Sequence, residues 1–286
     1  MIAYLAKEFK GSSHLIDDIN HWKNNTSKNF TVARSKFHFL RKVSSQKIFF
    51  GFNERAILYL IIVVLGSRRD IYLLLTNNLA RGRQLKVKYV YRFLNYFTKV
   101  KFIVHSDYEK SVLNTFGISS DRIEIRPHWL LINNSYNLSS SRKYDVAFFG
   151  PVKIDKDIDG FHDFSSFNIP FDSLLAVKLD SLSIAVKNIT RVNTRLDREE
   201  WLNLFRSTKL VFIPLDPGYE GKLSGIFMDS IACGCKVIIS NLEPYTSIFK
   251  GELAVHLLKD KYIYITNPSD YTIDLELVKR FYATFD

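Results

Sequence analysis

Three segments of the chain combine glycine, serine or lysine at points where a strand is expected to end. The most distinctive is LVFIPLDPGYEGKLSGIFMDSIACGCKVIIS, residues 210–240. Its apolar start is predicted to form a strand ending at Pro214, a Gly-rich loop follows, and Ser224 can cap a helix that ends at Gly234. Because Ser224 and Gly225 have little side-chain bulk, the N–H groups of the first helical turn stay open and can bind a phosphate.

Asp229 lies four residues after Gly225, on the same side of this predicted helix and one turn deeper. A carboxylate one turn past a phosphate site can accept hydrogen bonds from ribose hydroxyls. The alternative is a capped core helix on which Asp229 is only a solvated face residue. The spacing alone leaves both interpretations open.

Two further segments have a glycine and polar side chains after a predicted strand. In FFGPVKIDKD, Gly150 allows a tight turn, and Lys153 and Lys156 can direct their ammonium groups at phosphate oxygens. In FKGSSH, Gly11 allows close backbone approach and Ser12 can cap the following helix. Taken singly, the lysines also fit a solvated loop and the glycine also fits a common turn.

The histidines and cysteines do not form a metal-binding pattern. No two of the 7 histidines lie three or four residues apart, the helical spacing of paired zinc ligands. Cys233 and Cys235 are too close for an ordinary disulfide and too few for a zinc site. We therefore expect no metal and no cofactor.

The elements that must position these segments alternate between strands and helices. Predicted strands are 2–5, 47–50, 71–75, 102–104, 122–125, 145–149, 183–186, 210–213 and 236–239, and predicted helices are 13–22, 54–65, 84–98, 107–116, 198–205 and 225–232. The polar Asn/Ser stretch 132–142 is the best linker candidate. We expect an α/β fold of two Rossmann-like domains, 1–135 and 143–286, facing each other across a cleft with ligands at the carboxyl ends of the strands.

Charge is distributed unevenly over the 286 residues. Residues 1–142 hold 23 Lys+Arg and 9 Asp+Glu, a net charge of +14, whereas the remainder holds 17 and 20, a net charge of −3. The overall composition, 47% hydrophobic and 24% charged, excludes disorder, collagen and coiled coil as global descriptions. The two halves are expected to have different partners, and the basic half should favour an anionic surface.

The apolar segments are too short for a secretory signal or a membrane span. The run at 56–65 has about half of the ~20 residues that a spanning helix needs, and charged residues interrupt the apolar start of the chain. We expect a cytoplasmic protein that binds peripherally to the inner face of the membrane.

Basic residues lie within the predicted helix 84–98 and just before and after it. We assign five of them to acceptor or membrane contact: Arg81, Arg83, Lys88, Arg92 and Lys99. Basic residues interleaved with tyrosines suit an interfacial helix on anionic lipid, where each cation adds about 1 kcal/mol. The alternative is a helix with a solvated basic face and an aromatic core face, on which Leu85, Tyr89, Phe93 and Phe97 repeat every four residues. We expect no nucleic-acid partner, because no helix-turn-helix, zinc-finger or RNP-type motif occurs.

Together these segments resemble the nucleotide-sugar glycosyltransferases of the GT-B fold, specifically glycosyltransferase group 1 (family 4). FIPLDPGYEGKLSGIFMDSIACGCKVIIS is similar to the acidic, Gly-rich EA-ACG-PVI signature of that family, and FFGPVKIDK is similar to its GR...K strand-loop. FIVHSDYEKSVLNTFGISSDRIEIRPHW is similar to its strand-helix-strand run into the domain linker. The resemblance covers residues 102–240 well and the first hundred loosely.

The resemblance implies an activity and a set of site residues. The activity is transfer of a sugar from a nucleoside-diphosphate sugar to a membrane-linked glycan acceptor in surface polysaccharide or glycolipid synthesis, with retention of configuration. Lys156 would bind the donor diphosphate, Ser224 and Gly225 would cradle it, and Asp229 would bind the ribose. The full donor-binding set is Gly11, Ser12, Gly150, Lys153, Lys156, Gly221, Ser224, Gly225 and Asp229, and the catalytic pair is Lys156 and Glu220.

Two departures from the family pattern keep a second interpretation open. The arginine that follows the strand glycine in the family is Pro151 here, which leaves Lys153 as its substitute. The two acids of the family lie eight residues apart, but the residue eight before Asp229 is Gly221, and Glu220 is nine before it. The alternative is therefore a non-catalytic GT-B-like binding subunit or polyanion-binding module.

Overall fold

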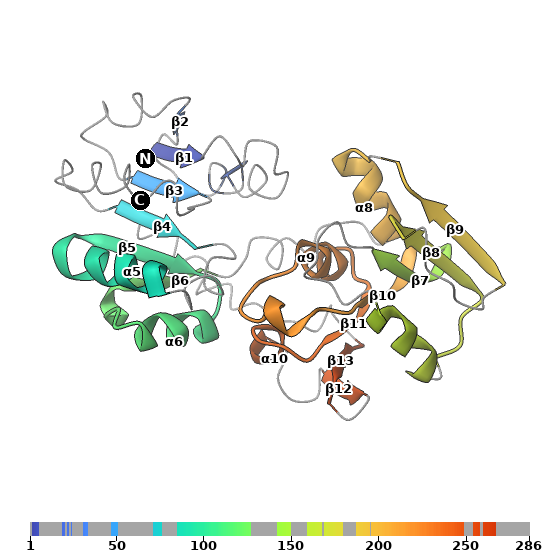
Figure 1. Ribbon diagram of the computed structural model, residues 1–286. Helices are drawn as coiled ribbons and strands as arrows, with labels where there is room; N and C mark the ends of the chain where they lie inside the picture. The colour runs from blue at the N-terminus through green and yellow to red at the C-terminus, as the bar shows by residue number, and fades with distance from the viewer. Residues whose placement is uncertain are drawn as a thin grey trace. The chain divides into compact units, whose positions relative to one another are not determined.

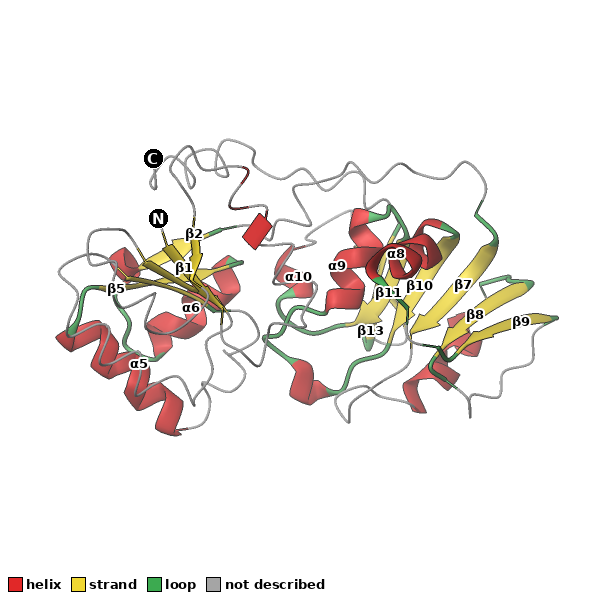
Figure 2. Ribbon diagram, turned by 90° about the horizontal axis from the view of Figure 1, so that it is seen from above, coloured by secondary structure: helices red, strands yellow, loops and turns green. Residues whose placement is uncertain are grey.

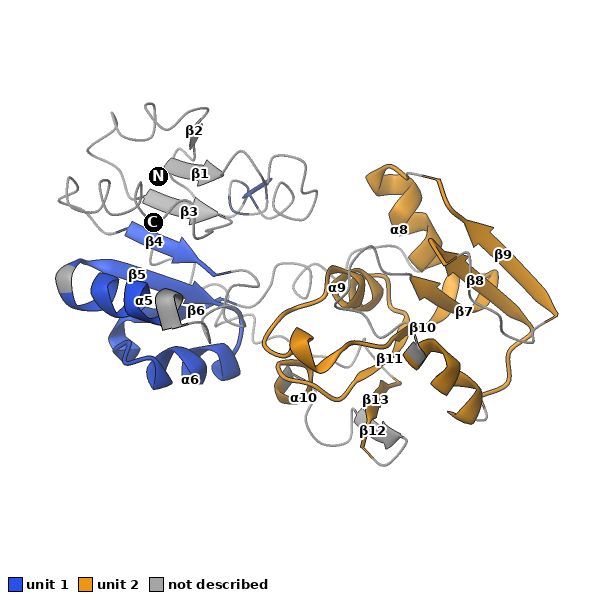
Figure 3. Ribbon diagram, in the orientation of Figure 1, with its two compact units in different colours: residues 1–129, 274–286 blue, residues 130–273 orange. Residues whose placement is uncertain are grey.

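The computed structural model describes residues 2–5, 19–20, 22, 24, 31–33, 47–50, 71–75, 85–126, 142–149, 159–167, 169–179, 187–194, 196–248, 254–257 and 260–266. The chain divides into two compact units (Figure 3). Unit 1 is Met1–Trp129 with Asp274–Asp286, and unit 2 is Leu130–Ile273. The sequence placed the boundary between 135 and 143 and grouped the last thirteen residues with the second domain, so the two divisions differ at both points.

Unit 1 contains a six-stranded sheet in which all neighbouring strands are parallel (Figure 1). Its spatial order is β2 (Thr31–Ala33), β1 (Ile2–Leu5), β3 (Lys47–Phe50), β4 (Ile71–Leu74), β5 (Val100–Val104) and β6 (Ile123–Ile125). All four residues of β4 are buried, as expected for a parallel strand covered on both faces. Five of these strands were predicted, and the three-residue β2 was missed.

Two helices of unit 1 follow the central strands. Helix α5 (Leu85–Phe97) precedes β5, and α6 (Asp107–Thr115) leads through the short η3 (Ser120–Arg122) into β6. The Ser106 hydroxyl caps α6 by accepting a hydrogen bond from the Glu109 N–H, 3.2 Å away. Gly117, at φ +83°, ends the turn after α6 because its backbone conformation is one that other residues rarely adopt.

Unit 2 contains a seven-stranded sheet in the order β12 (Ala254–Leu257), β13 (Tyr262–Ile265), β11 (Lys236–Ser240), β10 (Thr208–Ile213), β7 (Tyr144–Phe149), β8 (Ser173–Val177) and β9 (Asn188–Val192). The strands from β11 to β9 are parallel, and β13 and β12 extend the sheet antiparallel. The helical segments are η4 (Asp159–Phe167), α8 (Arg198–Arg206), η5 (Pro217–Tyr219), α9 (Gly225–Ala232) and α10 (Tyr245–Ile248). The α/β class with parallel sheets is confirmed.

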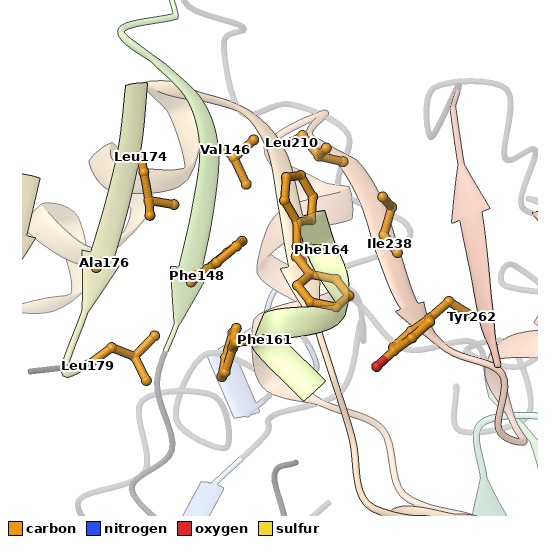
Figure 4. Close-up of a cluster of buried hydrophobic side chains, with 11 residues drawn as sticks. Val146, Phe148, Phe161, Phe164, Leu174, Ala176, Leu179, Leu210, Ile238 and Tyr262 are labelled. Atoms are coloured by element: carbon orange, nitrogen blue, oxygen red, sulfur yellow. The ribbon is translucent and has the colours of Figure 1, made fainter. Parts of the chain in front are cut away.

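The two faces of the unit 2 sheet are covered by different elements, because successive side chains of a strand point to opposite faces. On one face, Phe148 packs against Phe161 and Phe164 of η4, within an aromatic cluster that also includes Phe212 and Tyr262 (Figure 4). On the other, its neighbour Phe149 stacks on Phe205 of α8, ring centroids 4.3 Å apart. Helices α8 and α9 lie beside each other (Figure 2).

Candidate functional site

The candidate site begins where two neighbouring strands of unit 2 end. Strands β7 and β10 are parallel partners, with Phe148 opposite Phe212, so both chains leave the sheet at the same edge. Residues 150–158 follow β7 and residues 214–224 follow β10. The ends of the two strands that precede the predicted phosphate-binding segments therefore lie side by side. Gly150, Lys153 and Lys156 lie outside the described residues, as do Gly11 and Ser12 of unit 1.

Backbone and side-chain hydrogen bonds hold the loop from β10 to α9 in one shape. The Leu215 N–H donates to the Ser240 hydroxyl at 2.8 Å, and the Gly218 N–H donates to the Asp216 carboxylate at 2.7 Å. Gly221, buried and at φ +78°, donates its N–H to the Glu243 carbonyl at 2.7 Å. The Gly-rich character of the loop thus provides a tight turn just before the helix.

Ser224 caps α9, as the sequence predicted, and a tyrosine from a distant element holds it there. The Ser224 hydroxyl accepts a hydrogen bond from the Phe227 N–H. The buried Tyr245 hydroxyl accepts from the Ser224 N–H at 2.9 Å and donates to the Lys222 carbonyl at 2.7 Å. Tyr245 was not predicted, because a tyrosine 21 residues away carries no sequence signal that links it to this loop.

The first turn of α9 offers an anion-binding end. Gly225 and Ile226 are partly exposed, and the N–H groups of a first helical turn have no acceptor within the helix. The positive end of the helix dipole lies at the same point. The start of the helix at Gly225 and its end before Gly234, at φ +66°, agree with the sequence prediction. That a phosphate binds there stays a prediction.

Asp229 is fully buried, so the interpretation as a solvated face residue is wrong. Its two carboxylate oxygens accept a bidentate pair of hydrogen bonds from the Arg198 guanidinium, at 2.9 and 2.7 Å. The Trp201 indole N–H donates a third, at 2.9 Å. Asp229 therefore joins α9 to α8, a structural role that its sequence position did not indicate. Its contact with a ribose stays a prediction.

The acid that the family pattern would put eight residues before Asp229 is replaced by Gly221 for a backbone reason. At φ +78°, a residue with a side chain would be strained. Glu220, one position earlier, is half-buried and follows the short η5. Its catalytic role stays a prediction.

The structure contradicts one of the two interpretations of helix α5, and the membrane interpretation stays a prediction. Tyr89 and Phe93 are exposed. The interpretation that they belong to a buried aromatic face of the helix is therefore wrong. Arg92 donates from Nε to the Phe116 carbonyl at 2.7 Å, and Lys88 lies 5.8 Å from the Phe116 ring centroid, whereas Lys99 is exposed. Two of the three predicted membrane-facing cations thus contact the end of α6. Arg81 and Arg83 lie outside the described residues.

Unit 1 contains a buried polar cluster that the sequence did not reveal. Glu109 of α6 accepts hydrogen bonds from the His105 N–H, at 2.6 Å, and from the Ser106 hydroxyl, at 3.3 Å. His105 Nδ1 lies 2.9 Å from the carbonyl oxygen of Arg126, a buried residue whose guanidinium lies over the Trp22 ring. Burial raises the pKa of Glu109 from 4.5 to about 7.

No metal or membrane-spanning element is found in the part of the chain that the structure describes. Among those residues, no group of three or more His, Cys, Asp or Glu side chains could hold a metal ion, and no helix is both long and apolar enough to cross a bilayer. Cys233 and Cys235 are buried free thiols, and burial raises the pKa of each to about 12. Both thiols are therefore protonated at neutral pH.

Comparison with known proteins identifies the fold. No protein-family model matches the chain, and the search of curated proteins gives no match. Among solved structures, Anabaena Alr3699/HepE in complex with UDP has a TM-score of 0.61 at 11% identity, covering 88% of this chain and 84% of that chain. The complex of that protein with UDP-glucose gives 0.58 at 11% identity, covering 87% and 83%. An alpha-glucosyltransferase (AGT) in complex with UDP gives 0.50 at 12% identity, covering 84% and 80%. These similarities show that the chain has the α/β fold of GT-B proteins.

Proposed function

We propose that this protein is a glycosyltransferase that uses a nucleoside-diphosphate sugar as donor. The observation that carries the proposal is the open N-terminus of α9, capped by Ser224 and fixed by Tyr245 at the carboxyl edge of the unit 2 sheet. The structures of similar fold that hold UDP or UDP-glucose support it and make a uridine nucleotide the first candidate.

The chemistry rests on stabilising the diphosphate as it leaves. Negative charge grows on the leaving group during glycosyl transfer, and fixed donors aimed at that charge are usually the largest catalytic contribution. The N–H groups of Gly225 and Ile226 are such donors, and Lys156, from the segment that follows β7, would supply the cation. Asp229 would accept hydrogen bonds from the ribose hydroxyls.

The finer description of the reaction is part of the proposal. Unit 1 would bind the acceptor, a membrane-linked glycan in surface polysaccharide or glycolipid synthesis, and the family resemblance favours retention of configuration. The expected place of the enzyme is the cytoplasm, at the inner face of the membrane.

Nucleotide-dependent thermal stability tests the donor proposal. A ligand at 100 times its dissociation constant adds about 2.7 kcal/mol to stability, so UDP or GDP should raise the melting temperature. Ile226→Pro removes one N–H from the first turn of α9, where proline is tolerated, and should abolish this shift. Glu199→Pro, at the same position of α8, is the matched control and should keep it. If neither nucleotide stabilises the wild type, the proposal fails.

A non-catalytic binding subunit is the second candidate, and Gly221 is the observation that favours it. Eight residues before Asp229, where the family pattern has an acid, this chain has Gly221 at φ +78°, a backbone conformation that residues with a side chain rarely adopt. Release of UDP from UDP-sugars, measured with and without a membrane lipid extract as acceptor source, separates the candidates. Binding of UDP without any turnover would favour the binding subunit.

A further inference from the structure

Helix α5 exposes three aromatic side chains on one side. Tyr89 is 63% exposed, Phe93 37% and Tyr96 73%. With about 100° of rotation per residue, these positions lie within about 60° of one another around the helix. We refer to Tyr89, Phe93 and Tyr96 as the aromatic stripe. Among the described residues, Ile189 of β9 in unit 2 is the one other large hydrophobic side chain that is exposed.

The rotation of α5 about its axis is fixed by contacts on the opposite side. Tyr91 and Leu94 are fully buried, and the Tyr91 ring packs edge-on against Phe102 of β5, with centroids 5.7 Å apart. The buried Asn95 donates to the Gly117 carbonyl and accepts from the Ser119 N–H, each at 3.3 Å. Because these contacts hold the inner side against the sheet and the end of α6, the aromatic stripe cannot turn inward.

The segment of the chain that carries the stripe is basic, and its last cation, Lys101, is paired with Glu124 of β6. Residues 81–101 contain seven Lys or Arg and no Asp or Glu. Lys99, just after the helix, is exposed, and Lys88 and Arg92 flank the stripe while contacting the end of α6. An exposed aromatic surface bordered by cations therefore complements a partner that is apolar below its surface and anionic at its surface.

We propose that the aromatic stripe docks unit 1 onto an anionic phospholipid bilayer, with α5 lying in the plane of the interface. Aromatic rings, above all those with a polar tip such as tyrosine, are stable at the level of the lipid headgroups. Cations beside a helix of this kind add attraction to anionic lipid. The proposal does not depend on the nucleotide site, and it assigns the lipid contact to the aromatic side of α5 rather than to its basic flank.

Vesicle binding by the full chain tests this surface. Wild-type protein should sediment with phosphatidylcholine vesicles that contain about one third phosphatidylglycerol, and less with pure phosphatidylcholine. The triple variant Tyr89→Ser, Phe93→Ser, Tyr96→Ser should bind the mixed vesicles at least tenfold more weakly. Ile189→Ser removes an exposed apolar side chain from unit 2 and should bind like the wild type.

A fluorescent probe tests the depth of the contact without removing the stripe. In Tyr96→Trp, the added tryptophan should be quenched by lipids brominated on their acyl chains, beyond the quenching of the wild-type tryptophans. The midpoint of urea denaturation should be close to the wild-type value in the triple variant and in the probe, which shows that each is folded. The proposal is overturned by equal vesicle binding of wild type and triple variant, or by absence of added quenching. It is also overturned if the triple variant loses only self-association or RNA binding.

Discussion

The hydroxyl of Tyr245 lies 2.9 Å from the backbone nitrogen of Ser224 and 2.7 Å from the carbonyl oxygen of Lys222. One buried side chain thus holds both sides of the turn that leads into α9. The Tyr245 ring packs edge-on against Phe227, with centroids 4.8 Å apart, which fixes the position of the hydroxyl. The helix end proposed to bind the diphosphate depends on this contact for its geometry.

Tyr245→Phe should therefore weaken both the fold and nucleotide binding. The substitution leaves a buried N–H and a partly buried carbonyl without the hydroxyl that each contacts, which costs about 1–3 kcal/mol of unfolding free energy. Urea denaturation measures that loss, and calorimetric titration with UDP measures the lower affinity. Tyr264→Phe, which removes a hydroxyl from β13, is the matched control. Unchanged UDP affinity in Tyr245→Phe would show that the loop does not depend on this tyrosine.

Asp229→Ala should destabilise unit 2 as well as any nucleotide complex. The variant leaves the Arg198 guanidinium and the Trp201 N–H without the carboxylate that joins α8 to α9. Removing one partner of a fully buried ion pair costs about 3–5 kcal/mol. Because the Arg198 side chain is 22% exposed, the loss should lie near or below the lower end of that range. The free energy of unfolding from urea denaturation checks this value.

The double variant Arg198→Met, Asp229→Leu separates the structural effect from the ribose contact. Replacing both charges by apolar groups removes the unpaired charge, so stability should return towards that of the wild type. Nucleotide affinity should stay low if Asp229 contacts the ribose. Full recovery of UDP binding in the stable double variant would limit Asp229 to its structural role.

The sequence predicts the central strands of both sheets because buried parallel strands are continuous apolar runs. KIFF and LVFI are such runs, and they form β3 and the end of β10. SLLAV, which forms β8, was missed although it too is a buried apolar run that follows the turn residues Pro170 and Asp172. Strand β9 (NITRV) was missed because it is an edge strand with polar, exposed residues, and the strand expected at 183–186 lies outside the described residues.

The site could be predicted only where local sequence determines structure. Ser224 as a cap and Gly234 as a helix end follow from neighbouring residues. The contacts of Asp229 with Arg198, and of Ser224 with Tyr245, join residues 31 and 21 positions apart. For α5, a four-residue repeat of aromatic residues indicated a buried face, but the packing of Tyr91 and Leu94 against the sheet left that face outside.

Glu109 should make the stability of unit 1 depend on pH. Burial raises its pKa to about 7 in the folded state, above the value of 4.5 expected when it is exposed. Between these values the folded state binds more protons than the unfolded state. The free energy of unfolding should therefore fall as pH rises through this window, by at most about 1.4 kcal/mol per pH unit.

Glu109→Gln removes the titrating group and should flatten this dependence. Urea denaturation of wild type and variant at several pH values from about 4.5 to 7 measures the difference in slope. Glu124→Gln, at a partly exposed glutamate of β6, is the control and should keep the wild-type slope. Identical slopes for wild type and Glu109→Gln would show that the carboxyl does not titrate in this range.

Lys156→Ala should lower turnover more than donor affinity if the protein is a glycosyltransferase. A cation that meets charge growing on the leaving diphosphate stabilises the transition state more than the bound donor, so kcat should fall while KM for the donor changes little. Lys153→Ala, three residues earlier in the same segment, tests the cation proposed to replace the family arginine, and it should raise KM if it contacts the diphosphate equally in both states. Initial rates at varied UDP-sugar concentration separate the two effects.

If Lys156→Ala raises KM and leaves kcat unchanged, the lysine binds the donor without contributing to the chemical step. If neither constant changes, Lys156 lies outside the site, and the amides of α9 must stabilise the diphosphate without it.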